Sequence, residues 1–137
     1  DMLQYCVHTL TERGYVFIGM DHFAKPDEEL SIALKEGFLQ RNFQGYSTYA
    51  DCDLVAIGVS SIGKIGSTYS QNERDIDAYY AALDAGHLPI MRGYQLNQDD
   101  ILRRNIIQDL MCRFSLDYQI YESVFGIPFS SYFTAEL

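Results

Sequence analysis

A helical pattern that ends at a glycine and leads directly into a short buried strand opens the chain and predicts its class. Apolar residues recur at the 3–4 spacing of a helix face through Met2–Arg13. Gly14 is suited to end this helix, and the β-branched and aromatic run Tyr15–Ile18 predicts a buried strand. Helix, glycine and strand in this order form half of a βαβ repeat, so we expect an α/β fold.

The rest of the chain continues the alternation and then becomes mainly helical. Leu54–Val59 predicts a second buried strand, and Ile90–Leu96 predicts an extended segment. Helices are predicted from Pro26, from an Asn72/Asp75 capping pair, over 97–114 behind an Asn97/Asp100 capping pair, and over Tyr118–Phe125. We therefore expect one α/β part over 1–78, a linker over 79–96 and the start of a helical domain over 97–137.

Composition limits the partners of this chain. Its 47% hydrophobic content is ordinary for a globular protein, and the net charge of −9 with scattered basic residues argues against nucleic-acid binding. No apolar run reaches a membrane-spanning length, so we expect no membrane partner. The odd number of cysteines, 3, without C-x-x-C spacing, favours reduced thiols in the cytoplasm and no metal site. Both ends read as interrupted helices, which predicts a piece of a longer protein.

The segment Gly58–Lys64 fits the first seven positions of a phosphate-binding P-loop. The eighth position, which should hold Mg²⁺ through Ser or Thr, is Ile65. Two other interpretations stay open: a glycine-loosened turn after a strand, or small residues that let a ligand approach the backbone.

Two further segments carry polar groups directly after apolar runs. Asp21–His22 follows the Tyr15–Ile18 strand and could serve acid–base chemistry, or it could be a hydrogen-bonded pair that fixes a loop. Phe43–Tyr46, with the sequence FQGY, offers an aromatic face, an amide and a glycine, which suits a purine or sugar ligand. An ordinary strand edge is the alternative.

Together these segments resemble the oxygen-independent coproporphyrinogen III oxidases, a radical S-adenosylmethionine family. MDHFA at Met20–Ala24 and NFQGY at Asn42–Tyr46 carry the resemblance, which continues through Asp53–Gly66 and Arg92–Gly93. The related haem chaperones differ at the first two places. The resemblance implies the last strands and helices of an incomplete (β/α) barrel, followed by the start of a mostly helical C-terminal domain.

The resemblance also implies a chemistry and a set of site residues. The family oxidatively decarboxylates two propionates of coproporphyrinogen III to give vinyl groups, with S-adenosylmethionine and a [4Fe-4S] cluster as cofactors. By resemblance, Phe43, Gln44 and Ile62 lie around S-adenosylmethionine, whereas Asp21 and His22 receive no ligand role. Substrate propionates need cationic partners, and either Arg41 or Arg92 could serve. The catalytic residues are not identified.

The family's three-cysteine cluster motif is absent from this chain. We therefore expect the isolated chain to be inactive and, with barrel edges exposed, to self-associate. A non-catalytic haem-binding or haem-chaperone module of the same superfamily is the alternative.

Overall fold

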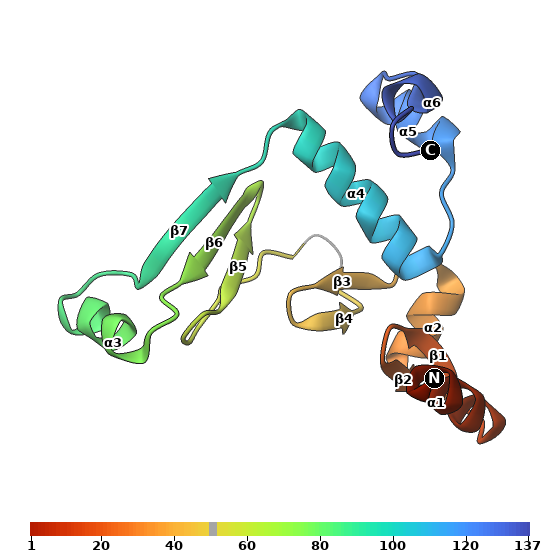
Figure 1. Ribbon diagram of the computed structural model, residues 1–137, viewed down its shortest axis with the longest axis horizontal. Helices are drawn as coiled ribbons and strands as arrows, with labels where there is room; N and C mark the ends of the chain where they lie inside the picture. Colours follow the sequence, from red (N-terminus) through yellow and green to blue (C-terminus); the bar gives the residue numbers. More distant parts are fainter. Residues whose placement is uncertain (50–51) are drawn as a thin grey trace. The chain divides into compact units, whose positions relative to one another are not determined.

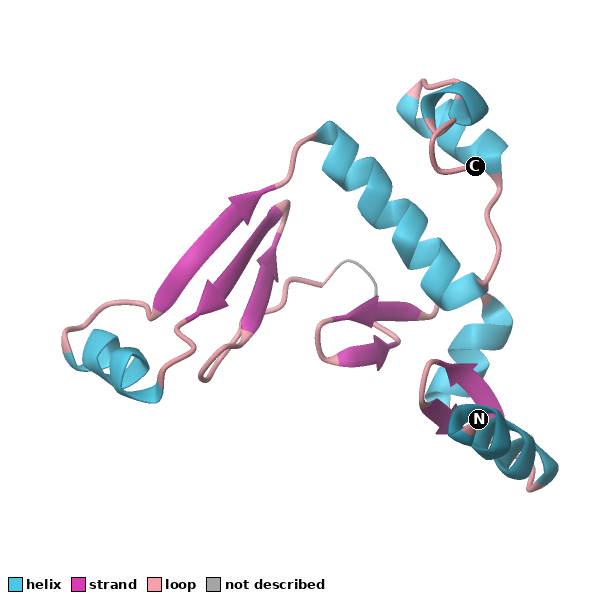
Figure 2. Ribbon diagram, viewed as in Figure 1, coloured by secondary structure: helices cyan, strands magenta, loops and turns pink. Residues whose placement is uncertain are grey.

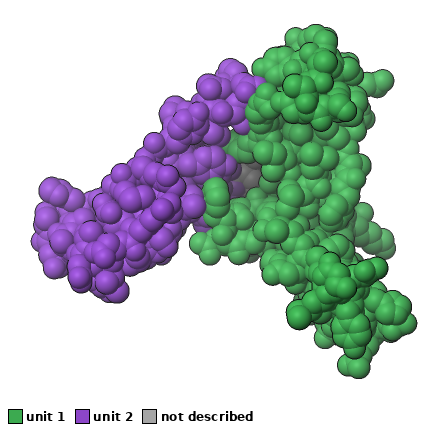
Figure 3. All heavy atoms as spheres, in the orientation of Figure 1, with its two compact units in different colours: residues 1–50, 102–137 green, residues 51–101 purple. Residues whose placement is uncertain are grey.

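The computed structural model describes residues 1–49 and 52–137, and the chain divides into two compact units (Figure 3). Unit 1 comprises Asp1–Ala50 and Leu102–Leu137, and unit 2 comprises Asp51–Ile101. Helices and strands both occur, which confirms the α/β class in its general form (Figure 2). None of the described helices is both long enough and apolar enough to cross a membrane.

Unit 1 combines helices with two small hairpins (Figure 1). Its elements are α1 (Met2–Glu12), β1 (Val16–Gly19), β2 (His22–Ala24), α2 (Glu29–Glu36), β3 (Gln40–Asn42), β4 (Gly45–Ser47), α4 (Gln98–Arg113, from Leu102 onward), α5 (Tyr118–Phe125) and α6 (Phe129–Tyr132). The first helix and the strand after it are confirmed nearly as predicted. The second helix begins at Glu29 rather than Pro26, because a turn in which Glu28 N donates to Lys25 O precedes it.

Two apolar clusters hold unit 1 together. The first consists of Ile18, Ala24, Ala33, Leu39 and Cys112, so it joins both strands of the first hairpin to α2 and to the end of α4. The second consists of Leu102, Tyr121, Phe129 and Phe133, and it packs the start of this part of α4 against α5 and α6. Burial of these side chains is the main source of stability in unit 1.

The capping pair predicted for α4 is present. Asp100 N donates to Asn97 Oδ1 at 2.9 Å and Asn97 N donates to Asp100 Oδ2 at 3.0 Å, so each side chain satisfies a backbone donor of the other residue. The predicted apolar face of this helix is only partly used, since Ile107 and Phe114 remain 59% and 61% exposed. The helix over Tyr118–Phe125 has the predicted bounds and ends at Gly126 in the left-handed conformation.

Unit 2 is an antiparallel sheet with one helix. Its strands β5 (Ile62–Ile65), β6 (Thr68–Asn72) and β7 (Ile90–Gln95) pair in that order, and α3 (Ile76–Asp84) connects the last two. The predicted extended segment is β7. The expected linker over 79–96 contains most of α3 and all of β7, and the domain boundary itself stays a prediction.

The predicted strand over Leu54–Val59 is wrong. Only Leu54 pairs, through an isolated bridge in which it exchanges backbone hydrogen bonds with Lys64 at 2.7 and 2.9 Å. Val55 and Ile57 are 70% and 85% exposed and Leu54 and Ala56 are only half-buried, so the described residues do not bury the apolar run whose composition suggested a strand.

Of the predicted Asn72/Asp75 capping pair, only Asp75 caps α3, so the prediction for Asn72 is wrong. Asp75 caps α3 by accepting from Ala78 N at 2.9 Å, whereas Asn72 ends β6 and is buried. All strand pairs in the described residues are antiparallel, so none of these pairs is of the parallel type found in a (β/α) barrel.

Candidate functional site

The FQGY segment forms the tip of the β3–β4 hairpin. Asn42 pairs with Gly45, which leaves Phe43 and Gln44 as a two-residue turn. The Asn42 side chain accepts from Gln44 N at 2.8 Å, and Gly45 has a φ of 126°, a conformation that favours glycine. Phe43 is 60% exposed at this tip. The turn therefore presents an aromatic ring and an amide on a backbone fixed by local hydrogen bonds.

Tyr46 anchors this hairpin to the rest of unit 1. Its hydroxyl donates to Met111 O on α4 at 3.1 Å, and its ring packs against the first apolar cluster. The ring fits because Gly19 has no side chain: a Cβ there would lie 2.9 Å from Tyr46 Cζ and closer still to the hydroxyl oxygen. Gly19 also has a φ of 152°. Gly19, which ends β1, thus makes room for Tyr46, the residue that anchors the hairpin with the Phe43–Gln44 turn.

The two motifs that carry the family resemblance lie side by side. His22 Nδ1 is 2.9 Å from Asp21 Oδ1, so the hydrogen-bonded pair considered from the sequence is present. The His22 and Tyr46 rings are nearly perpendicular, with a centroid distance of 5.1 Å. The His22 Nε2 atom would lie 3.3 Å from a Cβ on Gly45. The Asp21–His22 pair therefore borders the turn, although His22 and Gln44 are 22 positions apart in the chain.

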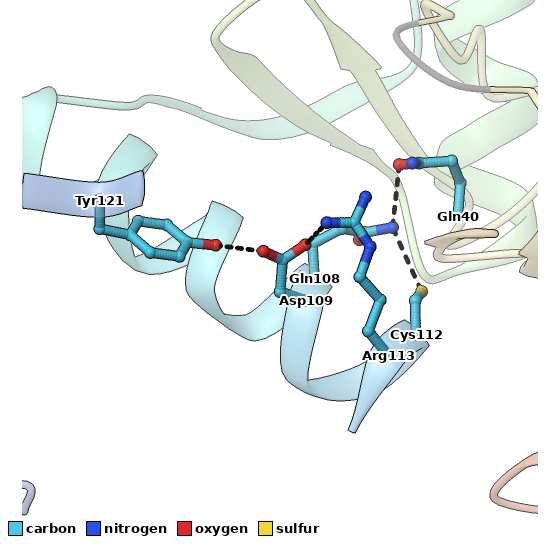
Figure 4. Close-up of polar contacts among 6 residues, drawn as sticks. All are labelled: Gln40, Gln108, Asp109, Cys112, Arg113 and Tyr121. Atoms are coloured by element: carbon cyan, nitrogen blue, oxygen red, sulfur yellow. Dashed lines mark hydrogen bonds and ion pairs between the residues drawn. The ribbon is translucent and has the colours of Figure 1, made fainter. Parts of the chain in front are cut away.

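Arg41, a candidate partner of the substrate propionates, lies on β3. It pairs with Tyr46 across the hairpin, and its guanidinium carbon lies 4.6 Å from the centroid of that ring. Gln108 on α4 reaches this strand and donates to Gln40 Oε1 at 3.0 Å and to Cys112 Sγ at 3.5 Å (Figure 4). With the amide oxygen and nitrogen exchanged, Gln108 pairs instead with the backbone N–H and C=O of Arg41, at 2.6 and 3.0 Å.

The positive charge of Arg41 affects the pKa of the Cys112 thiol. Burial raises the pKa of the Cys112 thiol, and the nearby positive charges of Arg41 and Arg113 oppose part of that rise. Cys112 is 1% exposed, so it belongs to the core rather than to an accessible reactive site.

A second polar cluster joins α4 to α5 (Figure 4). The Tyr121 hydroxyl donates to Asp109 Oδ2 at 2.7 Å, and Arg113 Nη1 lies 3.1 Å from Asp109 Oδ1. Burial raises the pKa of Tyr121, and the hydrogen bond to the Asp109 carboxylate raises it further. The Asp109/Arg113 spacing of one helical turn is visible in the sequence, but the tyrosine partner depends on tertiary packing.

The Gly58–Lys64 segment is not a P-loop. It leads into β5, whereas a P-loop leads from a strand into a helix. Its amides are also occupied: Gly58 N donates to the Tyr79 hydroxyl at 3.1 Å and Ser60 N donates to Glu73 O at 2.7 Å. The buried Asn72 amide donates to the Gly58 carbonyl at 3.0 Å. The protein itself therefore takes up the backbone groups that would bind a phosphate.

Ile62 lies half-buried at the start of β5, opposite Gln71 in unit 2. At the next residue, Gly63, a Cβ would lie 3.0 Å from Leu54 O and 3.2 Å from Ser70 Oγ. Gly63 thus permits a close approach of another group to the backbone. That group is the Leu54 carbonyl of the same unit. Ile62 belongs to unit 2, whereas Phe43 and Gln44 belong to unit 1.

The described residues offer no ligand set for a [4Fe-4S] cluster. No group of three or more His, Cys, Asp or Glu side chains within residues 1–49 and 52–137 is arranged to hold a metal. Cys6 is half-buried, Cys52 exposed and Cys112 buried, each as a free thiol. Three cysteine thiolates close together are what the family's cluster would need, so this group does not fit the described part of the chain.

Comparisons with known proteins support the resemblance. No protein-family model matches the chain. It is 54% identical to the oxygen-independent coproporphyrinogen III oxidase of Pseudomonas aeruginosa, a match that covers 100% of this chain and 30% of that protein. The oxidases of Escherichia coli and Helicobacter pylori are 47% and 44% identical, each over 100% of this chain and 30% of their own lengths.

A solved structure gives the same result. The chain matches coproporphyrinogen III oxidase from Escherichia coli, described as a radical SAM enzyme, with a TM-score of 0.91 and 47% identity. This match covers 98% of the chain and 31% of the solved one. The chain spans about 30% of the length of these relatives. Along its whole length it is therefore homologous to one segment of the oxygen-independent coproporphyrinogen III oxidases.

Proposed function

We propose that this chain is part of an oxidase that converts coproporphyrinogen III to protoporphyrinogen IX in anaerobic haem biosynthesis. The observation that carries the proposal is identity of 44–54% along essentially the whole chain to oxidases of that name. In the reaction, two propionate carboxylates would each lose carbon dioxide, a hydrogen atom and one further electron, which passes to a one-electron acceptor, and would become vinyl groups. The full-length parent would use S-adenosylmethionine and a [4Fe-4S] cluster, and would work in the cytoplasm.

Within that enzyme, Phe43, Gln44 and Ile62 are proposed to contact S-adenosylmethionine. The exposed ring of Phe43 suits stacking on an adenine, and the Gln44 amide can both donate and accept hydrogen bonds. Ile62 would add an apolar or backbone contact from β5. The local hydrogen bonds that fix the Phe43–Gln44 turn support the proposal, because a rigid backbone lowers the entropy lost on binding.

The finer architecture is also a proposal. Residues 1–78 would form the C-terminal part of an incomplete (β/α) barrel. Residues 79–96 would be a linker, and residues 97–137 would form the start of a mostly helical domain. The high TM-score to the Escherichia coli oxidase supports this arrangement for the whole protein. In barrels of this kind the working groups lie at the carboxyl ends of strands.

The proposal is tested by comparing the full-length parent with the isolated 137-residue chain. Both are reconstituted with iron and sulfide under anaerobic conditions and assayed for iron content, S-adenosylmethionine cleavage and coproporphyrinogen consumption. We expect all three from the parent and none from the chain. A parent that binds tetrapyrrole without consuming it would favour a haem-binding module, and turnover by the chain alone would contradict the assignment of the cluster to residues outside it.

We further propose that the isolated chain self-associates. Large apolar side chains such as Ile57, Leu88 and Val124 are 85%, 78% and 68% exposed in the chain by itself. Exposed apolar surface of this kind promotes association in water. Light scattering coupled to size exclusion tests this, and a monodisperse monomer at micromolar concentration would contradict it.

A further inference from the structure

Arg41 is a cation held in place without an anionic partner. Its Nη1 atom is buried and has no hydrogen-bond partner among the described residues, and no described carboxylate forms an ion pair with it. The residue as a whole is only half-buried. A buried polar group without a partner is costly, and most such groups in native proteins are satisfied by something. The arrangement therefore points to a ligand.

Two other arginines have clear side-chain partners. Arg92 Nε and Nη2 both donate to Gln71 Oε1, at 2.9 and 2.6 Å. Arg103 pairs with Glu136 at 2.7 Å. Arg104 also has a buried Nη1 without a partner, but only Arg41 lies on the hairpin that carries the Phe43–Gln44 turn. The choice between Arg41 and Arg92, open in the sequence, therefore falls on Arg41.

The position of the guanidinium suits a planar anion. It lies over the Tyr46 ring, a contact that uses the face of the cation and leaves its N–H edges for in-plane bonds. The ring itself is fixed by Met111 O and by the His22 ring, so the cation rests on a rigid support. An arginine edge matches a carboxylate with two parallel hydrogen bonds.

We propose that Arg41 binds a carboxylate beside the Phe43–Gln44 turn. This inference rests on the proposed function, which supplies two sources of that group: a propionate of the tetrapyrrole and the α-carboxylate of S-adenosylmethionine. In both cases Arg41 orients a ligand at the turn, because only two positions separate it from Phe43.

The test uses the full-length protein with Arg41→Gln, Arg41→Lys and the control Arg92→Gln. Binding is measured by fluorescence for coproporphyrin III and its tetramethyl ester, and by equilibrium dialysis for S-adenosylmethionine and its decarboxylated form. We expect Arg41→Gln to weaken binding of one acid by about tenfold or more, since a charge-assisted pair is lost. The matched ligand without a carboxylate and the Arg92→Gln protein should be unaffected, and Arg41→Lys should lie between wild type and Arg41→Gln.

The outcomes separate the two sources and the two proposals. A selective loss for coproporphyrin assigns the propionate, and a selective loss for S-adenosylmethionine assigns its α-carboxylate. Unchanged affinity for both acids, or equal loss for the acid and neutral forms, overturns the role of Arg41. If Arg41→Gln melts far below wild type, the same comparison is made with Arg41→Lys. A wild-type parent that binds neither ligand overturns the proposed function, and this inference with it.

Discussion

The Phe43–Gln44 turn of unit 1 and the Gly58–Lys64 loop of unit 2 differ in what their polar groups bind. The loop resembles a phosphate-binding motif in sequence, yet its amides and carbonyls bond to Tyr79, Glu73 and Asn72. The turn looks like an ordinary strand edge, yet an unpaired cation and an Asp–His pair lie beside it. Whether a glycine-rich segment can bind a ligand therefore depends on how far the protein already satisfies its backbone.

The same contrast appears in how each segment is held. Side-chain packing supports the turn, because Tyr46 crosses from β4 to α4 through the space left by Gly19. Hydrogen bonds hold the loop: the Asn72 amide donates to the carbonyls of Ala56 and Gly58, and Gly58 N donates to the Tyr79 hydroxyl. Adding a side chain at Gly19 should therefore destabilise the Phe43–Gln44 turn, whereas removing a hydrogen-bond partner should destabilise the Gly58–Lys64 loop.

Gly19→Ala should have the largest effect on stability. The added Cβ would collide with the Tyr46 ring, and a φ of 152° is one that side-chain-bearing residues rarely adopt. We expect unfolding of unit 1 to become easier by about 2–4 kcal/mol. Urea unfolding of the chain measures it, with Gly93→Ala as the control, since a Cβ there would lie 3.5 Å from Tyr69 O in ordinary contact. Equal stability of the two variants would contradict this account of the anchor.

Asn72→Ala should destabilise unit 2 by a smaller amount. It leaves the carbonyls of Ala56 and Gly58 without the buried donor that now reaches them at 3.4 and 3.0 Å, at a cost of about 1–3 kcal/mol. Tyr79→Phe removes only the acceptor of Gly58 N and should cost about 1 kcal/mol. Hydrogen exchange at the Gly58 amide should accelerate in both variants. Protection that stays at the wild-type level in both would show that the loop is held by other contacts.

Tyr121→Phe should have a small effect, similar to that of Tyr79→Phe, and that effect should depend on pH. Its pKa in the folded chain is raised above the ordinary tyrosine value of about 10, by burial first and by Asp109 second. A raised pKa contributes stability that is fully present below the unfolded pKa and is lost as the pH rises through the folded pKa. The variant should therefore lose about 1 kcal/mol near neutral pH, and the difference from wild type should shrink above about pH 10.

The control for this prediction is Tyr118→Phe. Tyr118 stacks on Phe129 at a centroid distance of 4.3 Å and is 39% exposed, so its ring contact survives the substitution. Thermal melts from pH 7 to 11 compare the three proteins. A stability difference between wild type and Tyr121→Phe that stays constant across this range would contradict the assigned hydrogen bond.

Local signals in the sequence predicted the elements that local chemistry determines. The capping pair before α4, the helix over Tyr118–Phe125 and the first helix–strand pair follow from spacing and end residues. The apolar run at Leu54–Val59 misled, because its composition favours a strand only where another layer buries it.

The candidate site was predictable only in part. The resemblance selected Phe43 and Gln44, and the geometry of their turn agrees with an accessible segment, but their ligand role stays a prediction. No local pattern could reveal that Gly19 admits Tyr46 or that Arg41 lacks a partner, since each depends on residues distant in the chain. Long-range packing creates these features.

Photo-crosslinking of an azido analogue of S-adenosylmethionine to the full-length parent, followed by peptide mapping, tests the central claim most directly. The account predicts crosslinks within the peptides that carry Phe43–Gln44 and Ile62, and their loss when unlabelled S-adenosylmethionine competes. Crosslinks confined to segments outside this chain, with neither peptide labelled, would contradict it.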